Sequence, residues 1–434
     1  MPFRFCARPA VRSVATLVTT LAALSAAESP TPPSAVTGTQ PTTAPLPGLR
    51  GAQLRLIDLG VNVMSVAGGS TAPDDQLGGL FSGHHDPARR GFTLQQAELS
   101  LSGAVDPYFT ATVHILAGEE GFELEEAAAT TTSLPAGLQV RAGYFPTEFG
   151  RTNPGHPHLW PWLSKPVAAC RFLGADGTRG AGARVAWLTP LPWYSRLLVG
   201  AQDAGNETAV SFRGLIDEDD DTITVAGRPR IESGVESPAD LLWLVRWENS
   251  VDLDAIAVRL GASLLSGPNA SGEDDAQTRI YGVDLVAKWT AAGASHGYPF
   301  LSFEAEAMQR DYQAAAFDDG VTVYAEADLR DRGGHAQVLW GVRSGWALGL
   351  RGEVASGSGE SGALARADDP ARDDRVRIAP LVMWNPTHFS RLRLEYDYDR
   401  FDHDVEGDGV GEDRAHSVWL GLEVQFGAHP VHQF

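Results

Sequence analysis

The chain has 434 residues, only two cysteines and a formal net charge of −21 at pH 7. This acidic balance argues against nucleic acid and anionic membrane surfaces as partners. Cys6 falls in a segment that we expect to be removed, so the mature chain would keep Cys170 alone and form no internal disulfide. A chain of this length usually splits into several domains, but β-barrels are an exception.

The N-terminal region has the pattern of an exported protein. Three arginines among the first twelve residues precede a short apolar run and then a stretch of small residues, which predicts a signal peptide over residues 1–27. That apolar run is shorter than the ~20 residues that span a bilayer, and no other segment is long enough for a transmembrane helix. We predict a flexible lead-in over 28–52, rich in Pro, Thr, Ser and Ala, and one barrel domain over 53–434.

From residue 53 onward the dominant hydrophobic period is two, which is typical of β-strands. Between 414 and 426, for example, Val418, Leu420 and Leu422 alternate with polar residues, glycine and tryptophan. The alternating segments run for ~10–14 residues, the length of a tilted membrane strand, whereas strands of a β-sandwich usually have ~5–6. Short turns and long polar links also alternate along the chain. This asymmetry is typical of an outer-membrane barrel.

These alternations predict an all-β fold, a transmembrane antiparallel β-barrel of about 16 strands with long extracellular loops. The sheet must close on itself, because lipid cannot satisfy the backbone polar groups of an open edge. The predicted strands lie near 54–67, 91–105, 107–117, 122–133, 137–146, 181–188, 194–202, 241–250, 254–265, 278–290, 298–311, 335–343, 346–355, 375–384, 390–401 and 414–426. Two further strand-like runs, at 208–215 and 321–329, are assigned to long loops; if both crossed the membrane, the count would be 18.

One long connection, residues 147–180, is rich in Pro, Trp, His and Gly and shows no helical period. A loop of this size needs cover from a larger structure. A barrel of sixteen or so strands encloses a lumen wide enough to hold it. We therefore predict that this loop folds into the lumen and narrows it. Its pore-facing groups are expected to be Glu148, Arg151, His156, His158 and Trp160.

Strand parity places charged side chains of both signs on the inner face of the barrel. An arginine on the lipid face would cost ~2–4 kcal/mol near the midplane, so parity and energetics agree. The wall residues expected at the constriction are Arg141, Arg184, Arg391, Arg393, Glu395 and Asp397. Opposed charges across a pore would order water and slow apolar solutes. The alternative is that these charges only pair with one another.

The long links are acidic, which predicts a weak preference for cations at the mouth. The acidic runs lie at 217–221, 273–275, 318–319, 368–374 and 402–413. Acidic loops also serve as plain solvated surface or as divalent-ion bridges to lipopolysaccharide.

Histidine pairs at 84–85, 156 and 158, and 429 and 432 are the candidates for metal binding. Structural zinc normally needs four ligands, and no Cys pair or His-Glu-x-x-His motif accompanies these pairs. His156 and His158 are therefore a candidate zinc site set against a packing or capping role, and no other cofactor is implied. A Gly-x-Ser-x-Gly elbow is absent and no Ser–His cluster is evident, so no enzyme is predicted.

Several sequence blocks carry a family resemblance. They are 92–99 (FTLQQAEL), 134–143 (LPAGLQVRAG), 149–161 (FGRTNPGHPHLWP), 187–193 (WLTPLPW) and the tail 427–434 (GAHPVHQF). In these blocks the chain resembles porin-like outer-membrane proteins often labelled zinc-regulated TonB-dependent outer-membrane receptors. The well-known TonB-dependent receptors carry a folded plug before a wider barrel, whereas only about 25 residues lie between the signal peptide and the first strand here.

The predicted function is passive diffusion of small hydrophilic solutes or ions through a porin-like channel in the outer membrane of a Gram-negative cell. A receptor or channel for zinc or metal complexes, linked to TonB, is the first alternative, and a binding barrel with a blocked lumen is the second. Expected partners are outer-membrane lipid, lipopolysaccharide and the barrel-assembly machinery, whose C-terminal aromatic signal Phe434 resembles. Pores of this kind are commonly homotrimers.

Overall fold

The computed structural model describes residues 57–87, 89–118, 121–214, 225–228, 230–231, 234–272, 276–318, 320–402 and 413–428. These residues fall in one structural unit, residues 53–434. The predictions for the signal peptide, the lead-in, the acidic runs at 217–221, 273–275 and 403–412, and the histidines of the tail concern residues outside the described ranges.

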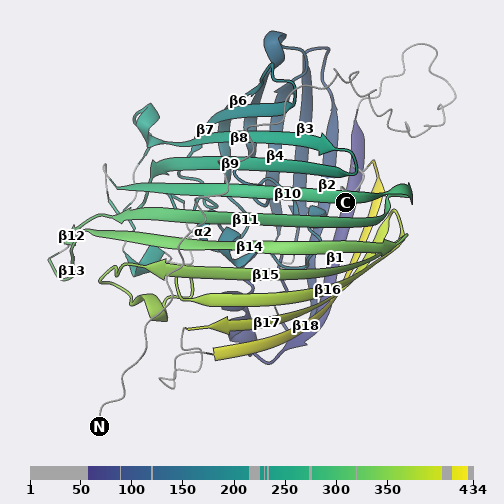
Figure 1. The fold of residues 1–434 in the computed structure, drawn as a ribbon. Helices are drawn as coiled ribbons and strands as arrows, with labels where there is room; N and C mark the ends of the chain where they lie inside the picture. Colours follow the sequence, from purple (N-terminus) through teal and green to yellow (C-terminus); the bar gives the residue numbers. More distant parts are fainter. Residues whose placement is uncertain are drawn as a thin grey trace. The chain divides into compact units, whose positions relative to one another are not determined.

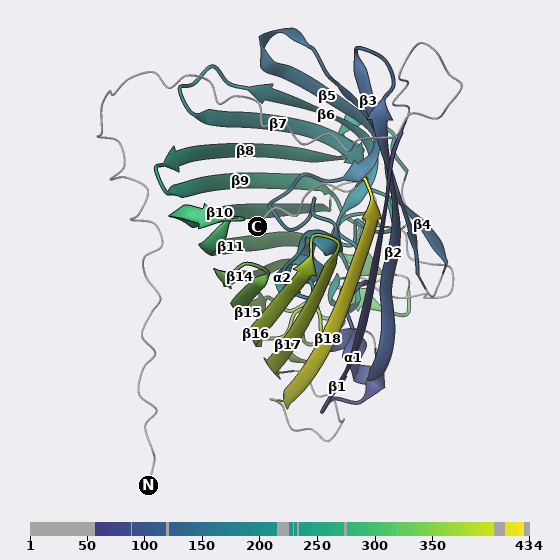
Figure 2. The ribbon, with the colours of Figure 1, turned by 90° about the vertical axis from the view of Figure 1, so that its right-hand side faces the viewer.

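Sixteen antiparallel strands form one closed barrel (Figures 1 and 2). The strands are β1 (Asp58–Ser70), β2 (Gly91–Ala104), β3 (Phe109–Ala117), β4 (Phe122–Thr131), β5 (Leu138–Pro146), β6 (Arg179–Leu188), β7 (Tyr194–Asp203), β8 (Leu241–Leu253), β9 (Ile256–Pro268), β10 (Gln277–Ser295), β11 (Tyr298–Ala314), β14 (Ala327–Arg343), β15 (Trp346–Ser358), β16 (Arg375–Thr387), β17 (Ser390–Phe401) and β18 (Asp413–Gly427). Each pairs with the next along the chain, and β1 pairs with β18 to close the ring. The predicted fold and its count of sixteen are confirmed, and the alternative of eighteen is wrong.

The two additional strand-like runs lie in long connections, as predicted. Residues 208–214 form turns. The second run contributes to a small hairpin of β12 (Phe317–Asp318) and β13 (Val323–Tyr324), and its end belongs to β14. β14 therefore begins at Ala327 rather than near 335, because its pairing with β11 continues as far as Ala314.

The connections divide between two rims. Long connections gather at the rim that carries the β12–β13 hairpin, on the left in Figure 1, and short turns join the strands at the other rim. The helical elements are α1 (Asp74–Leu80), α2 (Val167–Leu173), η1 (Pro135–Gly137), η2 (Pro157–Leu159), η3 (Val225–Gly227), η4 (Pro238–Asp240) and η5 (Arg366–Asp368). No helix in the described ranges is both long and apolar enough to span a bilayer.

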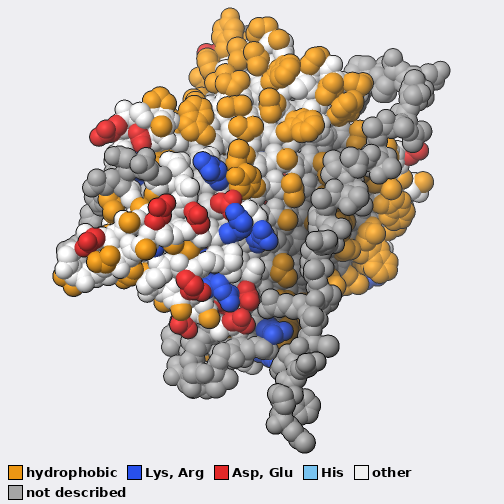
Figure 3. Space-filling view, turned by 60° about the vertical axis from the view of Figure 1, so that its left-hand side comes forward, with side chains coloured by type: hydrophobic (Ala, Val, Ile, Leu, Met, Phe, Trp, Pro, Cys, Tyr) orange, Lys and Arg blue, Asp and Glu red, His pale blue; other side chains and the backbone are white. Residues whose placement is uncertain are grey.

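The outer face of the wall is apolar, and strand parity predicts it correctly. Val418, Leu420 and Leu422 are 43–50% exposed on the outside of β18, whereas the alternate residues Trp419 and Glu423 are buried inside. Figure 3 shows the apolar wall above the long-loop rim, where charged side chains gather. Exposed aromatic side chains flank the short turns, as expected of a membrane-interface girdle. They include Trp187, Trp193, Tyr194, Trp384 and Phe389.

The interior of the barrel holds a packed segment. The β5–β6 connection, residues 147–178, enters the ring and is called the lumen loop below; Figure 2 shows its helix α2 inside the wall. Phe149, Phe172 and Leu173 of the lumen loop pack against Leu244 and Leu265, which point inward from β8 and β9. Two further apolar clusters join the loop to other parts of the wall. The predicted inward fold of this loop is therefore what the structure contains.

Candidate functional site

The lumen loop is built from short pieces that its prolines and glycines delimit. Pro157 lies in the first turn of η2, and Pro166 precedes the first residue of α2, positions where the missing N–H and fixed φ of proline are tolerated. The helix stops at Gly174, whose φ of 89° favours glycine and whose N–H donates to the carbonyl of Cys170. The sequence showed no helical period here because every residue of α2 is buried.

The first part of the lumen loop is fixed to β11. The Thr152 hydroxyl donates to Glu306 Oε2 at 2.6 Å, and the Thr152 N–H donates to the same oxygen at 3.1 Å. Arg151 Nε donates to Glu304 Oε2 at 2.9 Å. Gly150, with φ of 61°, passes so close to Glu306 that an added Cβ would overlap its carboxylate. This turn therefore requires glycine.

The later part of the lumen loop is fixed to the wall formed by β15, β16 and β17. The indole of Trp162 donates to the Ala379 carbonyl at 2.9 Å. The Leu163 N–H donates to Glu395 Oε2 at 2.6 Å, and the Val167 N–H donates to Glu353 Oε2 at 2.7 Å. Backbone donors thus satisfy carboxylates that are fully buried, which would otherwise be costly. Both parts of the loop are consequently held by one stretch of the wall, from β11 to β17.

A cavity of about 480 Å³ lies beside the lumen loop. It reaches toward the short-turn rim, since Ser250 and Ala257 near the β8–β9 turn line it. Among the residues expected at the constriction, the cavity is lined by Arg151, His156, His158, Trp160 and Arg391. Arg259 and Lys288 add basic charge on β9 and β10.

The other predicted constriction residues point inward but do not line this cavity. Glu148 pairs with Arg184, whose Nε lies 2.7 Å from Glu148 Oε1, and Arg141 lies beside both. Arg393, Glu395 and Asp397 are fully buried beneath the lumen loop.

Arg393 donates to Glu423 Oε2 at 3.0 Å and also to the carbonyl of Trp160. Arg393 and Glu395 therefore attach the loop to the wall. In this part of the wall the charged side chains pair with one another, which is the alternative that the sequence analysis left open.

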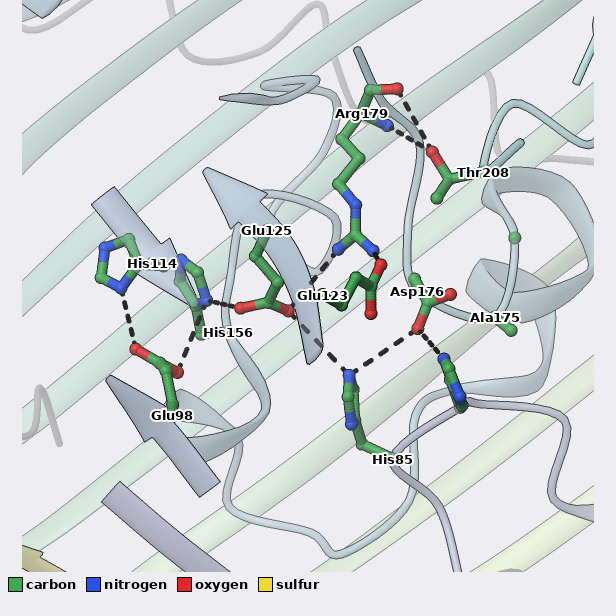
Figure 4. Close-up of polar contacts among 12 residues, drawn as sticks. His85, Glu98, His114, Glu123, Glu125, His156, Ala175, Asp176, Arg179 and Thr208 are labelled. Atoms are coloured by element: carbon green, nitrogen blue, oxygen red, sulfur yellow. Dashed lines mark hydrogen bonds and ion pairs between the residues drawn. The ribbon is translucent and has the colours of Figure 1, made fainter. Parts of the chain in front are cut away.

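A line of histidines and carboxylates runs between the wall and the lumen loop (Figure 4). Its inner end is the inner cluster, formed by Glu98, His114, His156 and His158. Glu98 accepts from His114 Nδ1 at 2.8 Å and from His158 Nδ1 at 2.9 Å, and His156 Nδ1 lies 3.7 Å from the same carboxylate. His156 is bound more closely by Glu125, at 2.7 Å.

The line continues to the outer cluster, formed by His84, His85, Glu123 and Asp176. His85 Nε2 lies 3.9 Å from Glu125 and 3.7 Å from Asp176 Oδ1, and His84 Nδ1 lies 2.9 Å from the same Asp176 oxygen. Sequence reasoning noted the two histidine pairs but did not bring them together. Neither Asp176 nor His114 was singled out, because their partners are distant in sequence.

The charges along the line are unequal. Burial alone would lower the pKa of His156, but the charge and hydrogen bond of Glu125 and the charge of Glu98 outweigh it and raise that pKa to about 10. Burial lowers the pKa of His85 despite the two carboxylates beside it. His156 is therefore cationic at neutral pH and clamps the lumen loop to the wall by ion pairs.

Two sets of residues in the described part of the chain place metal-ligating atoms within 4.8 Å of one another. They are Glu98, His114 and His156 in the inner cluster, and His84, Glu123 and Asp176 in the outer cluster. His156 and His158, the predicted zinc ligands, each hold a carboxylate by hydrogen bond.

A closed sixteen-strand ring with an apolar outer wall and an inward-folded loop defines an outer-membrane barrel of the porin fold. The outer membrane channel DcaP of Acinetobacter baumannii has this fold, with a TM-score of 0.53 and 11% identity over 85% of this chain and 97% of that one. The anion-selective porin of Comamonas acidovorans gives a TM-score of 0.48 and 11% identity, over 85% of this chain and 99% of that one. The protein is located in the outer membrane, as predicted.

An uncharacterized protein of Aquifex aeolicus (strain VF5) is 31% identical over 337 residues, which cover 75% of this chain and 68% of that protein. The chain belongs to the same family as that protein. No family model matches the chain. The label of zinc-regulated TonB-dependent receptor therefore gains no support, whereas the porin-like barrel that the resemblance implied is confirmed.

Proposed function

We propose that the protein is an outer-membrane channel through which small hydrophilic solutes and ions diffuse passively, with the lumen loop as its constriction. The observation that carries this proposal is the cavity of about 480 Å³ between the loop and the wall. A barrel of this width would leave an open aqueous lumen if nothing folded into it. The loop reduces that space to the size of a site for one small molecule.

The predicted weak cation preference rests on the acidic long loops, because the cavity itself is lined mainly by basic residues. Five basic residues, Arg151, Arg259, Lys288, Arg351 and Arg391, line the cavity against the single carboxylate of Glu304. Three of the five are paired: Arg151 with Glu304, Arg351 with Glu353, and Arg391 with Glu423.

Arg259 and Lys288 form no ion pair within the described residues. They oppose the acidic long loops, so the preference of the whole pathway is small.

Planar bilayers test the proposal directly. The folded protein should insert with discrete conductance steps, and a salt gradient should give a small reversal potential of the sign expected for cations. Silence from correctly folded barrels would overturn the channel, and a large anion selectivity would overturn the charge argument.

A second candidate function is a receptor or channel for zinc or metal complexes. The observation that favours it is the line of histidines and carboxylates along one side of the lumen loop.

A barrel with a blocked lumen that only binds its ligand is a third candidate function, and the tight attachment of the loop favours it. Homotrimeric assembly and recognition by the barrel-assembly machinery remain predictions from the sequence.

A further inference from the structure

We propose that the outer cluster is a binding site for one divalent transition-metal ion, of the class of Zn²⁺. The ligands assigned are His84, His85 and Asp176, with Glu123 beside them. His84, Glu123 and Asp176 place ligand atoms within 4.8 Å of one another, and His85 Nε2 lies 3.7 Å from Asp176 Oδ1. The site uses the histidine pair at 84–85 rather than His156 and His158, the pair that the sequence analysis took as the candidate zinc site. It deepens the second candidate function by naming its site, and it does not require that the barrel conduct.

A backbone contact fixes the tautomer and orientation of the His85 ring. His85 Nδ1 lies 3.1 Å from the backbone carbonyl of Gln95. A carbonyl only accepts, so Nδ1 carries the hydrogen and faces away from the cluster. This backbone contact is the one that orients imidazole ligands in metal sites.

The opposite nitrogen of the same ring faces the cluster. His85 Nε2 is buried and has no hydrogen-bond partner in the described residues. It points between two carboxylates, at 3.7 Å from Asp176 Oδ1 and 3.9 Å from Glu125 Oε1 (Figure 4). Ligand atoms around a tetrahedral zinc ion are roughly 3.3 Å apart. The distances from His85 Nε2 to these carboxylate oxygens are therefore slightly too long for hydrogen bonds. They are close to the separation of ligand atoms that share one cation.

The inner cluster provides a contrast. There, His114, His156 and His158 each direct Nδ1 at a carboxylate oxygen at 2.7–2.9 Å, so these atoms are occupied by hydrogen bonds. That cluster clamps the lumen loop. In the outer cluster His84 Nδ1 also lies 2.9 Å from Asp176 Oδ1, but His85 Nε2 has no hydrogen-bond partner among the described residues.

The ligand set and its access also fit a transition metal. Two imidazoles with carboxylates suit zinc, copper or nickel, whereas magnesium and calcium prefer oxygen alone. The His84 side chain is 42% exposed and belongs to the β1–β2 connection at the long-loop rim, so an ion can enter from that side. Arg179 pairs with Glu123 and lies 3.6 Å from Glu125, which leaves Asp176 as the main charged ligand.

The test is zinc binding to the folded barrel in detergent after removal of metal with a chelator. Equilibrium dialysis with ZnCl₂ should show one high-affinity ion per chain, not displaced by a hundred-fold excess of Mg²⁺. His85→Gln, and separately Asp176→Asn, should weaken binding at least ten-fold. His388→Gln, at an exposed short turn, is the matched control and should bind as the wild type does.

His114→Gln separates the two clusters, because it alters the inner one alone. Full zinc affinity in this variant is expected. Loss of binding there, or no binding by the wild-type barrel, would overturn the proposal. Zinc binding by the wild-type barrel can be measured even if a variant fails to fold, so the proposal stays testable. Conductance without zinc binding would support the channel proposal and overturn the metal site. Zinc binding without conductance would support the metal site and overturn the channel proposal.

Discussion

Removal of the Trp162 side chain tests how firmly the lumen loop is held. Trp162 is fully buried, packs against Phe300, Leu339 and Met383, and donates its indole N–H to the wall. Truncation of such a residue to alanine costs ~3–5 kcal/mol. The hydrogen bonds between the strands are unchanged, so the lost free energy mainly destabilises the attached state of the loop. At tenfold per 1.4 kcal/mol, the detached population should rise by roughly 10² to 4 × 10³.

The assay combines single-channel recording with limited proteolysis. Trp162→Ala should show larger or noisier conductance steps than the wild type, and its lumen loop should be cut faster by a protease added to reconstituted barrels. Trp384→Ala is the matched control, because this indole is exposed on the outer wall at the short-turn rim and makes the same change in volume. If both variants behave as the wild type does, the loop is not held by this contact and the reasoning is refuted.

Three further predictions follow from the site. Gly150→Ala should detach the first part of the loop, since the new Cβ would overlap Glu306, and accelerated loop proteolysis would show it. The pKa of His156 is raised to about 10, so its contribution to loop attachment is complete below about pH 6.5 and is lost as pH rises through 10. Proteolysis with chelator present should therefore accelerate between pH 7 and 10.5, and His156→Gln should remove this dependence. Replacing Arg259 and Lys288 together by glutamine should shift the reversal potential toward stronger cation selectivity, and an unchanged potential would show that neither residue faces the permeating ions.

The wall could be predicted from sequence because two physical constraints act on every strand. Lipid excludes charge from one face, which fixes the side of each residue, as on β18, where Val418 and Leu420 are outside and Trp419 is inside. The alternation of short and long connections then fixes the number of crossings. Strand ends are less constrained beyond the membrane, and β14 accordingly begins earlier than its alternation indicates.

The interior was harder to predict because its contacts join residues far apart in sequence. Glu395 receives the lumen loop at Ser164, 231 positions away, and Glu353 receives Val167, 186 positions away. No local pattern marks such partners. Helix α2 was not foreseen for a related reason: it is buried on all sides and lacks the one-sided apolar pattern that reveals a surface helix. The inward fold of the loop was predictable from its length and composition; its attachment points were not.

The conductance of the barrel with and without its lumen loop tests the central claim most directly. Wild-type protein and a variant lacking residues 152–172 would be reconstituted separately in planar bilayers, after each is shown to be folded. We expect small, discrete steps for the wild type and clearly larger ones for the variant. Equal conductance in the two, or silence from both, would contradict it.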